Sequence, residues 1–120
     1  MTRLFNAFFF SLAAIRFGWK KEAALRQELV LFAIAVPLAI LISSNAWKFL
    51  TLISIILLLL AVEFLNTAIE KLADRVCVEQ DPLIKIAKDC GSAAVLMILI
   101  IASGVWFLAF WEWLVSPATL

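Results

Sequence analysis

The sequence predicts an all-α membrane protein, with an N-terminal amphipathic helix on the membrane surface and three helices that cross the bilayer. Hydrophobic residues make up 66% of the 120 residues, charged residues only 16%, and the mean hydropathy is +1.10. A soluble domain of this length could not bury so much apolar surface, because small domains bury only part of their area. Three separate apolar runs indicate three helices that cross a bilayer. We therefore expect one integral-membrane domain over residues 1–120.

The N-terminal stretch "MTRLFNAFFFSLAAIRFGWKK" predicts an amphipathic surface helix over about residues 4–20. Its early Arg3 and the apolar run that follows also resemble a cleaved signal peptide. However, Arg16 and two lysines follow the run, and Asn6 interrupts it. A helix lying in the membrane interface, with its basic side chains toward water and its Phe side chains toward lipid, accounts for both features.

The first membrane span is expected over about residues 29–46. Its uninterrupted apolar part, Leu29 to Ile42, is short for a bilayer. We therefore expect the preceding polar stretch, "KKEAALRQE", to belong to the same helix. Pro37 lies inside this span, where proline is tolerated and often kinks the helix.

The second and third spans are expected over about residues 49–72 and 92–115. A short turn, "SSNAWK", precedes the second span, and the long polar stretch "DRVCVEQDPLIKIAKD" separates the two. In that stretch, Asp81 followed by Pro82 predicts a helix N-cap with proline at the first helical position.

Basic residues predict the orientation in the membrane. Five of them precede or open the first span: Arg3, Arg16, Lys20, Lys21 and Arg26. Four more lie around the connection between the second and third spans: Lys71, Arg75, Lys85 and Lys88. The turn after the first span has only Lys48, and the C-terminal tail has no basic residue. The positive-inside rule then predicts a cytoplasmic N-terminus and a periplasmic C-terminus.

The composition also argues against several kinds of partner and cofactor. The net charge is +1, and the chain contains neither Tyr nor His, so no basic tract resembles a nucleic-acid surface. Cys77 and Cys90 are far apart, and we expect both to be reduced thiols on the cytoplasmic side. Without His or a Cys cluster, a metal site would have to use oxygen ligands, which favours Mg²⁺.

Glu63, Asn66 and Glu70 have the spacing i, i+3, i+7, which places them on one stripe of a helix, with Thr67 beside it. An acidic side chain at the middle of a membrane helix costs about 2.5–3.5 kcal/mol. Such residues usually face a bundle interior or a cavity and indicate function. The alternative is that Glu63 and Asn66 only join helices through hydrogen bonds.

Two further polar clusters flank the spans on the same side of the membrane. The first consists of Glu22, Arg26, Gln27 and Glu28. The second consists of Lys85, Lys88, Asp89 and Ser92. Taken alone, the first fits a solvated helix face with an i, i+4 pair between Glu22 and Arg26, and the second fits a rim of snorkelling side chains. Together with the stripe they suit Mg²⁺-nucleotide chemistry, because Mg²⁺ binds through one or two carboxylates plus phosphate oxygens and Lys neutralises phosphate charge.

Three stretches, "EAALRQE" (22–28), "EFLNTAIEKLAD" (63–74) and "AKDCGSAAVL" (87–96), resemble the small integral-membrane diacylglycerol kinases of bacteria. The middle stretch matches the family signature, an E-x-x-N-[ST]-[SA]-x-E core with a terminal Asp. The resemblance implies a homotrimer in the bacterial inner membrane, with active sites at the cytosolic face that neighbouring protomers share. It implies transfer of the γ-phosphate of Mg-ATP to the hydroxyl of 1,2-diacylglycerol, which yields phosphatidic acid. The chain has no P-loop and no kinase Gly-rich loop, so spacing alone would support a kinase only weakly.

The resemblance also implies roles for individual residues. Glu63 would be the general base, supported by Asn66, and Glu22 and Glu70 would be the Mg²⁺ ligands. The implied ATP contacts are Arg3, Phe10, Glu22, Glu70, Glu79, Lys88 and Asp89. The implied lipid contacts are Arg26, Gln27, Glu28, Glu63 and Ser92. The chain departs from the family pattern where Phe10 replaces an expected Tyr, where Lys21 replaces an expected Asn, and at the "EQD" of 79–81.

Two alternatives remain open. Undecaprenol kinase shares the fold and the motifs but phosphorylates a polyprenyl alcohol, although the Trp-rich third span and the "WEW" ending look more like the diacylglycerol branch. The second alternative is a non-enzymatic small membrane protein, such as an exporter with an intramembrane Glu. That protein would be expected to carry its Glu in the first span.

Overall fold

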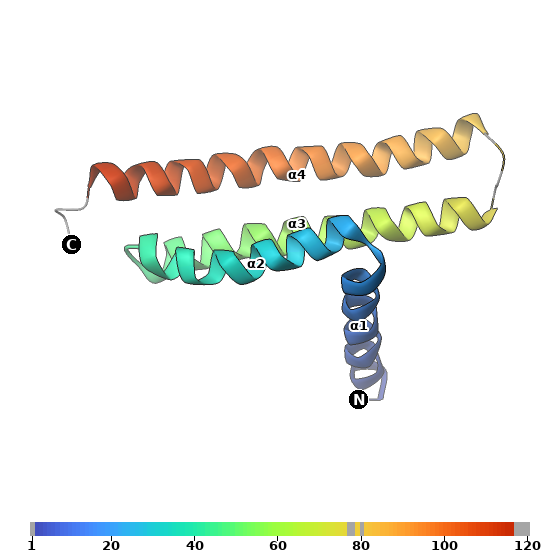
Figure 1. Ribbon diagram of the computed structural model, residues 1–120, viewed down its shortest axis with the longest axis horizontal. Coiled ribbons are helices and arrows are strands. Elements are labelled where there is room, and N and C mark those ends of the chain that lie inside the picture. The colour runs from blue at the N-terminus through green and yellow to red at the C-terminus, as the bar shows by residue number, and fades with distance from the viewer. Residues whose placement is uncertain (1, 77–78, 80, 117–120) are drawn as a thin grey trace.

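The computed structural model describes residues 2–76, 79 and 81–116, and these residues form four helices and no strand. The helices are α1 (Thr2–Lys21), α2 (Ala23–Ile42), α3 (Ala46–Val76) and α4 (Pro82–Val115). α2, α3 and α4 run alongside one another, whereas α1 points away from them (Figure 1). Each of these three helices is long and apolar enough to cross a membrane. The predicted all-α class, with one N-terminal helix and three spanning helices, is therefore confirmed, and the chain is a membrane protein.

α3 is the central helix and packs against both α2 and α4. Two clusters of buried side chains join the three helices. The first comprises Ala35, Ile55, Ile56 and Ala102, and the second comprises Ala39, Ile42, Leu52 and Ala109. The alanines come from α2 and α4, and small side chains let membrane helices approach closely. The indole Nε1 of Trp106 donates a hydrogen bond to the Leu52 carbonyl at 3.2 Å, which adds a polar contact between α4 and α3.

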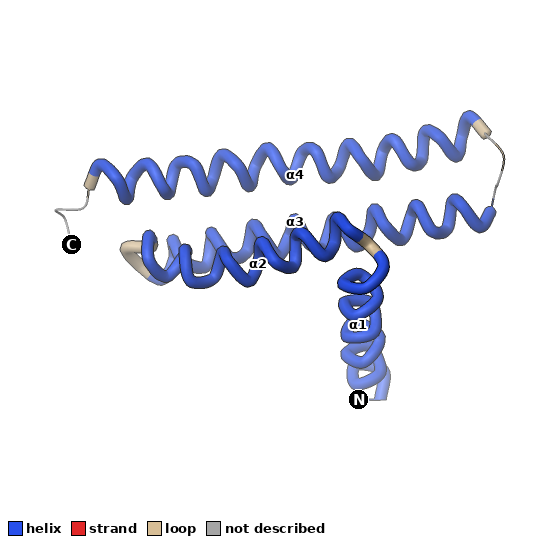
Figure 2. Tube along the Cα trace, viewed as in Figure 1, coloured by secondary structure: helices blue, strands red, loops and turns tan. Residues whose placement is uncertain are grey.

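The chain leaves helical geometry at Glu22, whose extended backbone (φ −121°, ψ 113°) separates α1 from α2. α2 starts directly afterwards at Ala23, so residues 23–28 of the polar stretch continue into the spanning helix as predicted. The prediction is wrong for Lys20, Lys21 and Glu22, because α1 ends at Lys21 and the backbone is extended at Glu22. α2 ends at Ile42, and residues 43–45 of the expected first span therefore lie in the turn to α3. Short loops join the helices wherever the connection is described (Figure 2).

The start of α4 confirms the predicted N-cap. The Asp81 carboxylate accepts hydrogen bonds from the backbone N–H groups of Leu83 (2.8 Å) and Ile84 (3.3 Å), and Pro82 occupies the first helical position. Cys90 on α4 is a free, exposed thiol. Cys77 and Gln80, which the sequence analysis also considered, lie outside the described residues.

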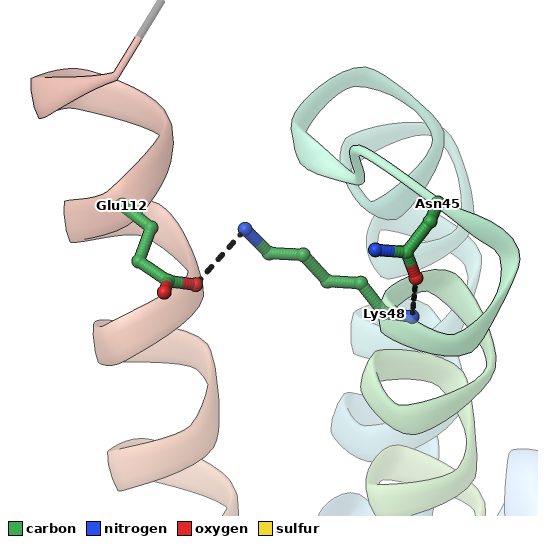
Figure 3. A network of polar contacts seen from close by, with 3 residues as sticks. All are labelled: Asn45, Lys48 and Glu112. Atoms are coloured by element: carbon green, nitrogen blue, oxygen red, sulfur yellow. Dashed lines mark hydrogen bonds and ion pairs between the residues drawn. The ribbon is translucent and has the colours of Figure 1, made fainter. Parts of the chain in front are cut away.

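An ion pair joins α3 to α4 at the end of the bundle where α2 meets α3 (Figure 3). Lys48 Nζ lies 3.2 Å from Glu112 Oε1, and the Lys48 side chain is only 17% exposed. The Asn45 side-chain oxygen accepts a hydrogen bond from the Lys48 backbone N–H at 2.9 Å and so caps the start of α3. The pair therefore holds the C-terminal part of α4 against the first turn of α3.

Replacing Glu112 with Gln is expected to lower the free energy of unfolding by less than about 1 kcal/mol, because Glu112 is more than half exposed and such pairs contribute little. Exchanging the two charges in the double variant Lys48→Glu, Glu112→Lys should recover part of the loss. Thermal unfolding in lipid bicelles measures both effects. A charge-exchanged double variant less stable than Glu112→Gln would contradict the attribution to this pair.

Candidate active site

The polar stripe of α3 lies largely inside the helix bundle. Glu63, Asn66 and Thr67 are buried, with exposed fractions of 6%, 8% and 7%, whereas Glu70 is exposed one turn further on. The side-chain oxygen of Asn66 is buried and has no hydrogen-bond partner among the described residues. A buried acid beside an unpaired amide oxygen is costly, so this stripe is the strongest structural indication of a functional site.

Acidic side chains from three other positions gather around Glu63. The Glu63 carboxylate is within electrostatic reach of Glu70 and of Glu22, at the corner between α1 and α2. Glu28 on α2 lies close enough to repel Glu63, and its Oε1 is buried without a hydrogen-bond partner among residues 2–76, 79 and 81–116. The structure thus brings two acids near the start of α2, Glu22 and Glu28, close to Glu63, which shares α3 with Glu70. Their mutual repulsion favours a bound cation or a shared proton.

Gly91 allows α4 to approach the stripe closely. It is buried, and a Cβ atom at this position would overlap with the Asn66 side-chain oxygen and lie 3.8 Å from Ile69 Cδ1. Any larger side chain would have to displace Asn66 or push α4 away from α3. The glycine is therefore required by the packing around Asn66.

Three lysines near this site form ion pairs with acids, two of them between different segments of the chain. Lys71 Nζ lies 2.7 Å from Glu22 Oε1, and Lys88 Nζ lies 2.6 Å from Asp74 Oδ1. Lys85 forms a third pair with Asp89 at 2.7 Å within α4. The pairs of Lys71 and Lys88 connect α3 to the α1–α2 corner and to the start of α4.

The expected pair between Glu22 and Arg26 is wrong. Glu22 pairs with Lys71 instead, and Arg26 Nη1 donates a hydrogen bond to the Trp19 carbonyl at 2.9 Å. The i, i+4 geometry of a surface pair requires a continuous helix. Here the chain is extended at Glu22, so α2 begins one residue too late for that pairing.

Several residues that the resemblance places near the nucleotide or near the lipid headgroup are exposed in the structure. Arg3 and Phe10 are exposed on α1, the helix that leads away from the bundle (Figure 1). In the part of the chain that the structure describes, no hydrogen bond or ion pair joins Arg3 to the acidic cluster. Glu79 is exposed in the α3–α4 connection, and Gln27 and Ser92 are exposed on α2 and α4.

Lys71, Asp74 and Gly91 were not among the site residues predicted from the sequence. Asp74 is four residues after Glu70 and continues the polar stripe, so the helical spacing could have identified it. Lys71 is four residues after Thr67 and could have been found in the same way. Gly91 carried no such signal, because only the approach of α4 to α3 explains it.

The donor atoms of this site suit a hard cation such as Mg²⁺. Across the described residues, no three His, Cys, Asp or Glu side chains lie close enough to ligate a metal ion. Mg²⁺ does not need such a cage, because it usually keeps several waters and binds one or two carboxylates together with phosphate oxygens. Glu22 and Glu70, both within reach of Glu63, are carboxylates of this kind.

Comparison with known proteins gives a consistent picture. The profile of the family described as prokaryotic diacylglycerol kinase matches residues 9–110. The chain is 41% identical over 111 residues to a diacylglycerol kinase of Escherichia coli K12. The aligned region covers 92% of this chain and 91% of that protein. It is 40% identical over 106 residues to a diacylglycerol kinase of Pseudomonas aeruginosa, covering 88% and 86% of the two chains. For a diacylglycerol kinase of Haemophilus influenzae the identity is 37% over 106 residues, with coverage of 88% and 90%.

Proposed function

The chain belongs to the prokaryotic diacylglycerol kinase family and is an ATP-dependent lipid kinase, and we propose that it phosphorylates the free hydroxyl of 1,2-diacylglycerol. The γ-phosphate of Mg-ATP is transferred, and the product is phosphatidic acid. The observation that carries this proposal is the family match over residues 9–110. The buried acids around Glu63 supply groups suited to the chemistry.

In this proposal Glu63 is the general base. Its carboxylate takes the proton of the lipid hydroxyl while the hydroxyl oxygen attacks the γ-phosphorus, and the bond to the β–γ bridging oxygen breaks to release ADP. Glu63 is buried among the apolar helices. This position supports its role as the base, because the hydroxyl of diacylglycerol reaches the site from the bilayer and not from the aqueous phase. The unpaired oxygen of Asn66, one turn away, is available to orient the acceptor or the base.

Glu22 and Glu70 are the proposed ligands of Mg²⁺. When bound, the ion would neutralise the charge of the triphosphate. Lys88 and Asp89 are proposed to contact ATP, so Lys88 would exchange its present partner Asp74 for phosphate oxygens.

The remaining contacts to the substrates are proposed from the family resemblance. Arg3, Phe10 and Glu79 would lie near the nucleotide. Arg26, Gln27, Glu28 and Ser92 would lie near the headgroup of the lipid. Among these residues, Glu28 has direct support, because its buried oxygen lies beside Glu63 without a hydrogen-bond partner.

We further propose a homotrimer in the bacterial inner membrane, in which each protomer is a single domain whose three spans lie within α2, α3 and α4. The N-terminus and the active site face the cytoplasm, and the C-terminus faces the periplasm. Only 11% of the most apolar stretch of α4 is buried within the protomer, which leaves a large face for neighbouring protomers or lipid. Arg3 and Phe10 belong to α1, the helix that points away from α2, α3 and α4 (Figure 1), and this arrangement favours sites shared between protomers.

A direct assay tests the substrate. Purified protein in lipid bilayers is given Mg²⁺ and [γ-³²P]ATP together with either diacylglycerol or undecaprenol. The expected result is labelled phosphatidic acid from diacylglycerol. Labelling of undecaprenol alone would instead identify an undecaprenol kinase, and labelling of neither lipid would contradict lipid kinase activity.

A further inference from the structure

Lys71 connects three parts of the molecule. Its Nζ lies 2.7 Å from Glu22 Oε1 at the α1–α2 corner and 5.7 Å from the ring centroid of Phe17 on α1. It is also within electrostatic reach of Glu70 and Asp74 on its own helix. One ammonium group on α3 therefore contacts the corner residue and α1, and it lies near three carboxylates.

An exposed ion pair usually contributes little, and the Lys71 side chain is more than half exposed. The pair between Lys71 and Glu22 differs from an ordinary surface pair because Glu22 is one of the two proposed metal ligands. Glu22 makes no side-chain capping hydrogen bond at the start of α2, and its exposed fraction is less than half that of Lys71. Lys71 also lies near Glu70, the second carboxylate assigned to the metal. A single positive charge thus stands beside both proposed metal ligands.

We propose that Lys71 is a built-in counter-ion of the metal site, which a divalent cation must displace from Glu22 before it can bind. This inference rests on the proposed assignment of Glu22 and Glu70 to Mg²⁺. In the metal-free protein the ammonium offsets the repulsion among the acids and, with Phe17, holds the α1–α2 corner against α3. Lys71 is a positioning residue, since it acts on the metal ligands and not on the reacting atoms. Its presence lowers the affinity of the site for a divalent cation alone.

The test measures binding of Mn²⁺ in place of Mg²⁺, by the loss of the electron paramagnetic resonance signal of free Mn²⁺, with protein in lipid nanodiscs and without nucleotide. Lys71→Met is expected to raise the affinity for Mn²⁺ by up to about fivefold, because it removes a competing charge of an exposed pair. Lys71→Arg retains the charge and should bind Mn²⁺ like the wild type.

Lys85→Met is the matched control. Lys85 forms an ion pair of the same length, 2.7 Å, with Asp89, and both side chains are exposed. This variant removes one lysine near the same end of the bundle without touching Glu22, so it should leave the Mn²⁺ affinity unchanged. Should Lys71→Met fold poorly, as judged by circular dichroism, Lys71→Gln provides the same loss of charge with a polar side chain.

Glu22→Gln, measured in parallel, separates this inference from the proposed function. Weaker Mn²⁺ binding by Glu22→Gln without any gain from Lys71→Met would overturn the role of Lys71 and leave the metal ligand in place. No effect of Glu22→Gln would remove the ligand assignment and the inference with it. Absence of Mn²⁺ binding in both the wild type and Lys71→Met would also overturn the inference, because removing the competing charge should admit the ion.

Discussion

Glu63→Gln is expected to lower kcat for lipid phosphorylation by about 10²–10⁴-fold, because the amide has nearly the same shape but cannot accept the proton of the lipid hydroxyl. The variant should remain folded and should retain its affinity for ATP. The neighbouring acids Glu22, Glu28 and Glu70 repel the Glu63 carboxylate, so removing its charge should leave the protein at least as stable as the wild type. The ³²P transfer assay measures kcat, and binding of a non-hydrolysable ATP analogue reports on the nucleotide site.

Glu112→Gln is the matched control for this experiment. It removes one carboxylate from the opposite end of the bundle, where Glu112 pairs with Lys48 far from the acidic cluster. The control should keep normal turnover. Normal turnover of Glu63→Gln would show that Glu63 is not the base. A loss of stability together with activity would favour the alternative in which Glu63 joins helices through hydrogen bonds.

Gly91→Ala is expected to destabilise the protein by about 1–3 kcal/mol and to remove most of its activity, because added atoms in a packed interior force neighbouring groups to move. The new methyl group would overlap with the Asn66 side-chain oxygen, so either Asn66 leaves its position or α4 moves away from α3. Both changes disturb the surroundings of Glu63. Thermal unfolding in bicelles and the phosphorylation assay give the two readouts.

Gly104→Ala, on the same helix, is the control. Beyond its own helical turn, no described atom lies within 4 Å of the place its Cβ would take. Alanine is favoured over glycine in helices by up to about 1 kcal/mol, so this variant should be as stable as the wild type or more stable. Adding Asn66→Ala to Gly91→Ala should recover stability but not activity. Failure of that double variant to regain stability would mean that the overlap with Asn66 is not the cause.

Part of the candidate site was predictable from local spacing. Glu63 and Asn66 share a stripe because a helix repeats every 3.6 residues, and the same rule extends to Asp74. The assignment of separate roles to the acids came from the family resemblance and stays a prediction. The partners of the lysines could not be predicted, since Lys71 and Lys88 bind acids on other segments.

The sequence by itself determined the helical class, the three spanning helices and the N-cap at Asp81, because hydropathy, periodicity and capping act over a few neighbouring residues. Only the tertiary structure decided that Glu22 pairs with Lys71 and not with Arg26, and that Gly91 lies against Asn66. These contacts depend on the break at Glu22 and on how α4 is rotated and positioned against α3. No local pattern in the sequence predicts these two contacts, because each one joins residues that only the packing of the helices brings together.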